Sequence, residues 1–134
     1  MITTLRDIRV LIAEPHFSVR ASLSILMSAF EDMYKVGEVA NGVEAIRQCV
    51  ELQPDVLLLG AAFADIDGLD VARAVAQTAR PPFIILLGGP QGEGHEQAAL
   101  NAGVNVYFTA QARGYDVIDA IQAVPRSVAG INRS

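Results

Sequence analysis

Short apolar runs alternate with segments of helical periodicity along almost the whole chain, and this alternation restricts the possible folds most strongly. Continuous apolar runs are typical of strands that are covered on both faces, and a helix-period segment follows each run. Such repeated βα units form a parallel sheet flanked by helices. The runs are 8–13, 34–40, 56–59, 83–87 and 105–109, and the predicted helices are 17–30, 43–52, 69–79, 95–102 and 115–124.

Five units of this length predict an α/β domain with a doubly wound, five-stranded parallel sheet of the flavodoxin-like (βα)5 type. Right-handed crossovers place helices on both faces of such a sheet. The run 34–40 is less apolar than the others, so we expect it near an edge. Within the helix 43–52, Val43, Ile46 and Val50 are expected to face inward.

Ligand sites in open sheets of this kind lie at the carboxyl ends of the strands. The segments expected there are 14–16, 60–67, 88–94 and 110–113. The predicted domain spans 1–124, and the composition of 125–134 is that of a C-terminal linker or tail.

Composition narrows the class of protein further. A chain of 134 residues with 51% hydrophobic residues can bury a full core as one soluble domain. Cys49 is the only cysteine, which excludes an internal disulfide and favours a reducing, cytoplasmic compartment. The net charge of −5 argues against direct nucleic-acid contact by this domain. The longest apolar stretch, 56–64, is too short to span a membrane, and 1–7 lacks the apolar region of a signal peptide.

Four motifs follow the predicted strands and their loops: VLIAEPH (10–16), PDVLLLG (54–60), AAFADIDGLDVA (61–72) and ALNAGVNVYFTA (99–110). Together they resemble the receiver domains of bacterial two-component response regulators, in particular those that precede helix-turn-helix output domains. The resemblance covers about residues 7–124 and includes scaffold positions of the family pattern.

The resemblance implies a chemistry in which an aspartate carboxylate attacks phosphorus and forms an acyl phosphate. In the family, an acidic pair and the acceptor hold Mg²⁺, a lysine adds positive charge, and a Ser or Thr hydroxyl transmits the switch. This sequence departs from that pattern at most of these positions. Gly60 stands at the phosphoacceptor position, Glu14 and Pro15 at the acidic pair, Leu87 or Gly88 at the hydroxyl position, and Ala110 at the lysine position.

Only Glu14 and the aromatic switch residue Tyr107 are retained. Of the ten basic residues nine are arginine, and the single lysine, Lys35, lies in the second βα unit. No shift of the alignment can therefore place a lysine after the fifth strand. The sequence predicts a degenerate pseudo-receiver that is not phosphorylated and is not an enzyme, with no catalytic residue, no metal ion and no cofactor.

Each remaining candidate has a simpler structural explanation. We expect Glu14 to be a solvated acid at a strand end rather than a cation ligand, since one carboxylate is too few for Mg²⁺. Asp65 is a candidate replacement acceptor, whereas Asp67 followed by glycine suits a helix entry. His16 and His95 could form a metal site with Glu14, but we expect both histidines to be surface residues.

Four other features each have a functional and a structural explanation. The glycine-rich loop 88–94 could bind an anion through backbone amides, although its spacing favours a flexible loop. Arg113 could supply positive charge near Ala110, but an exposed loop arginine is the simpler expectation. Cys49 is expected to be an inert core residue. For Tyr107, packing as a half-buried aromatic residue and a switch role that reports a partner stay open.

Three functions remain. The leading hypothesis is a phosphorylation-independent regulatory and protein-interaction module, the input part of a transcription regulator. Its expected partner is a second copy or another protein, bound through receiver surfaces formed by the first helix or the fourth and fifth units. The alternative is a small-molecule sensor that uses the crevice emptied by the losses at Gly60, Leu87, Gly88 and Ala110. A weak third hypothesis is residual phosphotransfer through Asp65.

Overall fold

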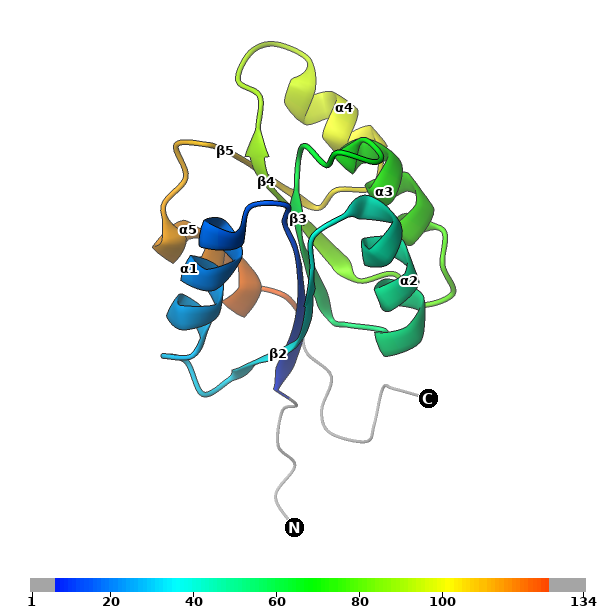
Figure 1. Ribbon diagram of the computed structural model, residues 1–134. Coiled ribbons are helices and arrows are strands. Elements are labelled where there is room, and N and C mark those ends of the chain that lie inside the picture. The colour runs from blue at the N-terminus through cyan, green and yellow to red at the C-terminus, as the bar shows by residue number, and fades with distance from the viewer. Residues whose placement is uncertain (1–6, 126–134) are drawn as a thin grey trace.

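The computed structural model describes residues 7–125 and contains the predicted sheet. All strand pairs are parallel, in the order β2-β1-β3-β4-β5, so the predicted doubly wound topology is confirmed (Figure 1). β2 lies at an edge, as its polar sequence predicted. The strands are β1 (Ile8–Ala13), β2 (Met33–Val39), β3 (Val56–Gly60), β4 (Phe83–Gly89) and β5 (Val106–Thr109).

The helices are α1 (Phe17–Met27), α2 (Gly42–Leu52), α3 (Gly68–Ala76), α4 (His95–Asn101) and α5 (Gly114–Gln122). Four of the five helices are one to three residues shorter than predicted, and β4 continues through Gly89 into the predicted loop 88–94. Gly103, which has a φ of 106°, ends the turn after α4. Of the predicted tail 125–134, all but Pro125 lies outside the described residues. Within 7–125, no helix is long and apolar enough to cross a membrane.

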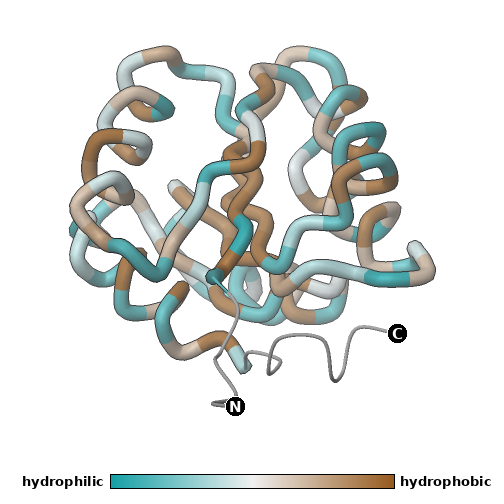
Figure 2. Tube along the Cα trace, turned by 90° about the horizontal axis from the view of Figure 1, so that it is seen from below, coloured by the Kyte–Doolittle hydropathy of each residue, from teal (hydrophilic) through white to brown (hydrophobic). Residues whose placement is uncertain are grey.

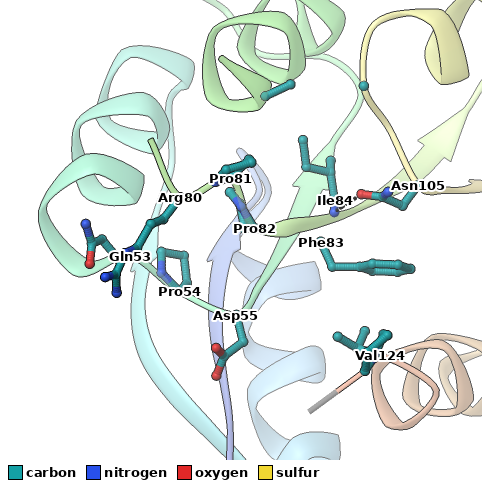
Figure 3. Close-up of a pocket in the computed structure, with 13 residues that line it drawn as sticks. Gln53, Pro54, Asp55, Arg80, Pro81, Pro82, Phe83, Ile84, Asn105 and Val124 are labelled. Atoms are coloured by element: carbon teal, nitrogen blue, oxygen red, sulfur yellow. Dashed lines mark hydrogen bonds between the residues drawn. The ribbon is translucent and has the colours of Figure 1, made fainter. Parts of the chain in front are cut away.

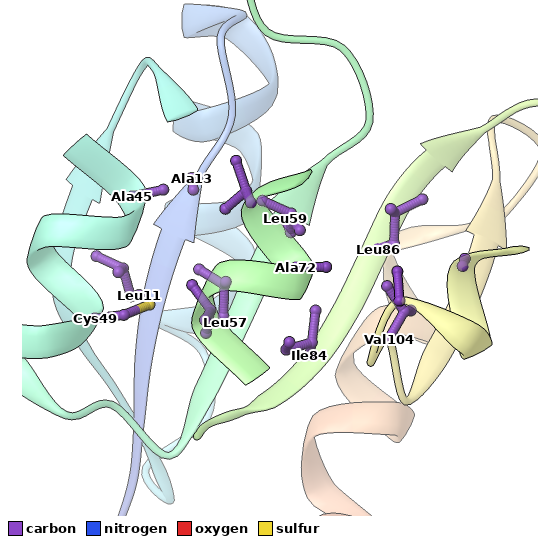
Figure 4. Packing of buried hydrophobic residues seen from close by; sticks show 14 residues of the cluster. Leu11, Ala13, Ala45, Cys49, Leu57, Leu59, Ala72, Ile84, Leu86 and Val104 are labelled. Carbon is purple, nitrogen blue, oxygen red and sulfur yellow. The ribbon is translucent and has the colours of Figure 1, made fainter. Parts of the chain in front are cut away.

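Alternate residues of the central strands supply two separate core layers, because successive side chains of a strand point to opposite faces. In β1, Ile8, Val10 and Ile12 pack with α1 and α5, whereas Leu11 and Ala13 pack with α2 and α3. Figure 4 shows the layer beneath α2 and α3, and Figure 2 shows the apolar strands running through the middle of the molecule. The sheet is thereby covered on both faces.

The predicted inward face of α2 was wrong in part. Val43 and Val50 are 58% and 55% exposed, and the helix buries Ala45 and Cys49 instead. Ile46, predicted to face inward, is half-buried against the same core layer. The helix begins at Gly42 rather than Val43, and its apolar stripe follows residues 42, 45, 46, 49 and 52, so both valines lie on its flank.

Candidate functional site

Most of the sequence-predicted site residues converge at the carboxyl edge of the sheet. Glu14 follows β1, and Gly60 is the last residue of β3. Gly60 pairs with Leu87 of β4 across the ladder, and Ala110 follows β5 directly. Parallel strands end at one edge, so residues that are far apart in the chain meet there.

Glu14 is buried, which corrects the expectation that it is a solvated acid. Its residue is only 6% exposed, the single charged residue buried in the part of the chain that the structure describes. The Oε1 atom accepts a hydrogen bond from the backbone N–H of His16 at 3.1 Å and lies 2.6 Å from His16 Nδ1. A buried carboxylate needs such donors, because an unpaired one would lose its hydration without compensation.

The other carboxylate oxygen of Glu14 packs against Gly60. A Cβ atom built on Gly60 would clash with Glu14 Oε2 and would lie 3.2 Å from Pro15 Cδ. Glycine is therefore the only residue that fits at the end of β3 while Glu14 keeps this conformation. The crevice expected to be empty at Gly60 is in fact filled by Glu14.

Arg20 holds the β1–α1 loop in the conformation that buries Glu14. Its guanidinium donates to the backbone carbonyls of Glu14 at 2.7 Å and Pro15 at 3.2 Å, and lies 3.4 Å from the Glu38 carboxylate. His16 itself is exposed and forms the N-terminal cap residue of α1. Arg20 was not predicted from the sequence, because it lies one helical turn into α1 and belongs to no motif.

Asp65 has a structural role that the sequence did not reveal. Its two carboxylate oxygens accept the backbone N–H groups of Gly42 and Val43, each at 2.9 Å. These hydrogen bonds lower the pKa of Asp65, because they stabilise its ionised form. The loop after β3 is thus fastened to the first turn of α2. Asp67 accepts the Leu69 N–H at 2.7 Å and caps α3, as predicted.

The β4 half of the edge is less regular. The β4–β5 ladder shifts register between Leu86 and Gly89, and Gly88 within this shift has a φ of 73°. The ring of Tyr107 lies against Gly89, where a Cβ would clash with it, and its hydroxyl donates to the Pro90 carbonyl at 2.5 Å. Desolvation, with a smaller effect of the Glu96 charge, raises the pKa of Tyr107. Tyr107 is thus half-buried, which agrees with one of the two expectations for it, that of a packed aromatic residue.

A groove of about 500 Å³ opens beside this half, between α1 and the segment that joins β5 to α5. Its floor and walls are mainly apolar. Four of the sequence-predicted positions line it: Glu14, Leu87, Gly88 and Ala110. Arg113, also singled out from the sequence, lines it and is exposed. The groove could not be predicted from the sequence, because the α1 residues that line it belong to no motif.

Other candidates lie apart from this groove. His95 is exposed at the start of α4, as expected for a surface histidine, and does not join Glu14 and His16. Among residues 7–125, no group of three or more His, Cys, Asp or Glu side chains is arranged to hold a metal ion. Cys49 is buried, and desolvation raises the pKa of its thiol to about 12. It is a core residue, as predicted.

A second cavity, of about 480 Å³, lies at the opposite edge of the sheet, where β3 and β4 begin (Figure 3). Prolines dominate its rim, and the Ile84 N–H donates to Asn105 Oδ1 at 2.7 Å beside it. None of the sequence-predicted site residues lines this cavity. The cavity and the predicted site thus lie at opposite ends of the strands.

Comparison with known proteins agrees with this geometry. The family model described as "Response regulator receiver domain" matches residues 10–123. The chain is 29% identical over 119 residues to the Transcriptional regulatory protein LiaR of Bacillus subtilis (strain 168), covering 89% of this chain and 56% of that protein. It is 30% identical over 119 residues to the Response regulator protein VraR of Staphylococcus aureus (strain Mu3 / ATCC 700698), with 89% and 57% covered.

Solved structures show the same fold. The response regulator domain of Thermotoga maritima CheB superposes with a TM-score of 0.81 at 23% identity, covering 89% of this chain and 96% of that one. The receiver domain of the putative response regulator NarL from Mycobacterium tuberculosis gives a TM-score of 0.79 at 23% identity, with 88% and 98% covered. The chain spans a little over half of the curated relatives that it matches, LiaR and VraR. From its sequence, its sheet order and these matches, the chain belongs to the response regulator receiver domain family.

Proposed function

We propose that this chain is a pseudo-receiver that works as a phosphorylation-independent regulatory and protein-interaction module. The observation that carries the proposal is the pair Glu14 and Gly60. At the end of β3, where the family pattern has its phosphoacceptor, Gly60 offers no nucleophile, and the Glu14 carboxylate packs against it. Formation of an acyl phosphate needs an attacking carboxylate at that point.

The other degenerate positions support the same proposal. Leu87 and Gly88 carry no hydroxyl, and Ala110 carries no cation, so the groups with which the family binds and reports a phosphoryl group are absent from these positions. Lys35 cannot act as a substitute, because its ammonium group is paired with Glu38 in the second unit.

The residues at this edge do not fit the Mg²⁺ ion that the family uses. Mg²⁺ binds through carboxylates together with phosphate oxygens and water. Glu14 is the one acid of the family's set that remains, and its Oε1 atom is engaged by His16 while Oε2 packs on Gly60. Asp65, the candidate for residual phosphotransfer, has both oxygens committed to the first turn of α2. We therefore propose that the chain does not catalyse phosphotransfer.

The proposed partner is a second copy of the chain or another regulatory protein. Phe17 and Ile25 on α1 are each 73% exposed, and Tyr115 at the start of α5 is also exposed. Large exposed apolar side chains that gather on neighbouring elements are typical of protein interaction surfaces. Since LiaR is named a transcriptional regulatory protein and is longer than this chain, we propose that the domain is the cytoplasmic input part of a transcription regulator, without direct nucleic-acid contact of its own.

Treatment with acetyl phosphate followed by intact-protein mass spectrometry tests the central claim. No covalent phosphate should form, whereas a receiver that carries aspartate at the position of Gly60 should gain mass under the same conditions. A stable phosphate on any Asp or Glu of this chain would refute the proposal.

Sedimentation analysis tests the interaction surface. If α1 mediates self-association, Ile25→Asp should lower the average mass of the wild-type assembly, because it puts a charge on the proposed surface. Val43→Asp is the matched control, since Val43 is an exposed valine on the other side of the sheet. A chain that stays monomeric at millimolar concentration would remove self-association from the proposal and leave only another protein as partner.

A further inference from the structure

We propose that the groove between α1 and the β5–α5 segment binds a small organic carboxylate with an apolar tail. This inference names the ligand class for the small-molecule alternative raised from the sequence. It does not depend on whether the chain is phosphorylated. The groove has a volume of about 500 Å³, which lies within the range of small-molecule sites. Such sites are mostly apolar, with a few polar groups that orient the ligand.

The apolar part of the groove would hold the tail. Side chains from α1, β4, β5 and α5 line it, and they come from four separate elements of the fold. These residues are Leu23, Leu26, Leu87, Phe108 and Val117. The groove is also closed tightly at one place: a Cβ built on Gly114 would lie 2.6 Å from Leu26 Cδ2, so α5 begins in direct contact with α1 there.

The polar part of the groove favours a negative charge. Arg113 is exposed and lines the groove, and among residues 7–125 its guanidinium makes no ion pair or hydrogen bond. Glu14 is the only acid that lines the groove, and its carboxylate is engaged by His16 and packed on Gly60. Arg113 is thus the charged side chain of the lining that has no partner among the described residues, in a chain whose net charge is −5.

Three hydroxyl groups also line the groove and could donate to a carboxylate. They belong to Ser18 and Ser22 of α1 and Thr109 of β5. Within the described part of the chain, none of these hydroxyls has a protein hydrogen-bond partner. Charge-assisted hydrogen bonds from a guanidinium and hydroxyls are the interactions that hold a carboxylate in most binding sites.

Octanoate, octanamide and octylamine are suitable probes, because they share one tail length and differ in the charge of the head group. We expect octanoate to give saturable amide NMR shifts in α1 and in residues 110–114, and to bind more tightly than the other two. The overall negative charge would by itself favour octylamine. Equal or tighter binding of octanamide or octylamine, shifts confined to other parts of the molecule, or no saturable binding would each overturn the proposal.

Two variants sharpen the test. Arg113→Gln should weaken octanoate binding about tenfold, the loss of a charge-assisted contact, with octanamide binding unchanged. Arg73→Gln is the matched control, since Arg73 is an exposed arginine on α3 that pairs with Asp70. Ser22→Phe should block the groove for all three probes, with the amide spectrum confirming the fold. Unchanged octanoate affinity in Arg113→Gln, or a dimer that covers the groove and excludes octanoate, would overturn the proposal.

Discussion

The two halves of the carboxyl edge differ in how the space at the ends of the strands is filled. On the β1–β3 half, the Glu14 carboxylate packs against Gly60, and its Oε1 atom is engaged by His16 within the loop. On the β4–β5 half, Leu87, Gly88 and Ala110 border a groove, and the guanidinium of Arg113 beside them has no partner among the described residues.

The difference shows that the loss of a functional side chain does not in itself create a cavity. Glu14 is long and flexible, and it follows β1 directly, so its carboxylate can reach the space beside Gly60. Near Ala110, the neighbouring side chains belong to α1 and α5, whose positions are fixed by the core beneath them. The groove lies between these two helices.

Gly60→Asp tests the β1–β3 half and should have the largest effect on stability. A new side chain would clash with the Glu14 carboxylate and would place two acids in one buried space. We expect a loss of about 3 kcal/mol in the free energy of unfolding, measured by urea titration, and no phosphorylation by acetyl phosphate.

The double variant Gly60→Asp/Glu14→Ala is the control for this prediction. It should recover part of the lost stability, because it removes both the clash and the second acid. Wild-type stability in Gly60→Asp alone would show that Glu14 moves freely. Robust Mg²⁺-dependent phosphorylation of that single variant would show that the losses at Pro15, Leu87 and Ala110 matter less than proposed.

Gly89→Ala tests the packing of Tyr107 in the β4–β5 half. A Cβ at this position would overlap the Tyr107 ring and should displace it, which would break the hydrogen bond to Pro90. We expect a loss of about 2 kcal/mol in stability and changed amide shifts in the β4–α4 loop. Gly88→Ala is a useful comparison, since a Cβ at Gly88 meets no atom but the φ of 73° strains it. A native amide spectrum in Gly89→Ala would contradict the packing described for Tyr107.

Asp65→Asn tests the loop between β3 and α3 through the pH dependence of stability. The folded-state pKa of Asp65 is lowered, so its stabilising effect is present above the unfolded value near 3.8 and is lost as pH falls through the folded value. The variant should melt a few degrees below wild type at neutral pH, because an amide cannot accept both N–H groups.

The two melting temperatures should then converge as the pH is lowered below the ordinary pKa of an aspartate. Calorimetry across this range measures the difference directly. A gap that stays constant down to the acid transition would show that the Asp65 carboxylate does not make these hydrogen bonds in solution.

Arg113→Gln should have the smallest effect on stability. An exposed arginine without a protein partner contributes little to folding, so the free energy of unfolding should change by no more than about 0.5 kcal/mol. Urea titration in the absence of any carboxylate checks this. A larger loss would mean that Arg113 is bound within the fold, and the contrast between the two halves would weaken.

Much of the architecture could be predicted from periodicity alone. The order of βα units, the parallel sheet, the edge position of β2 and the helix entry at Asp67 all follow from local patterns, because they depend on residues close together in the chain. The inward face of α2 was partly mispredicted, since Val43 and Val50 are as apolar as the residues that the helix buries. Only the neighbouring helix and strands decide which flank is covered.

By itself, the sequence determined the fold class and the absence of an aspartate or lysine at the ends of β3 and β5, because side-chain identity is fixed before folding. The tertiary structure alone decided what fills the space these residues leave. The burial of Glu14 against Gly60, the attachment of Asp65 to α2 and the open groove beside Arg113 all depend on side chains from separate βα units. Their contacts form only when the strands meet at one edge of the sheet.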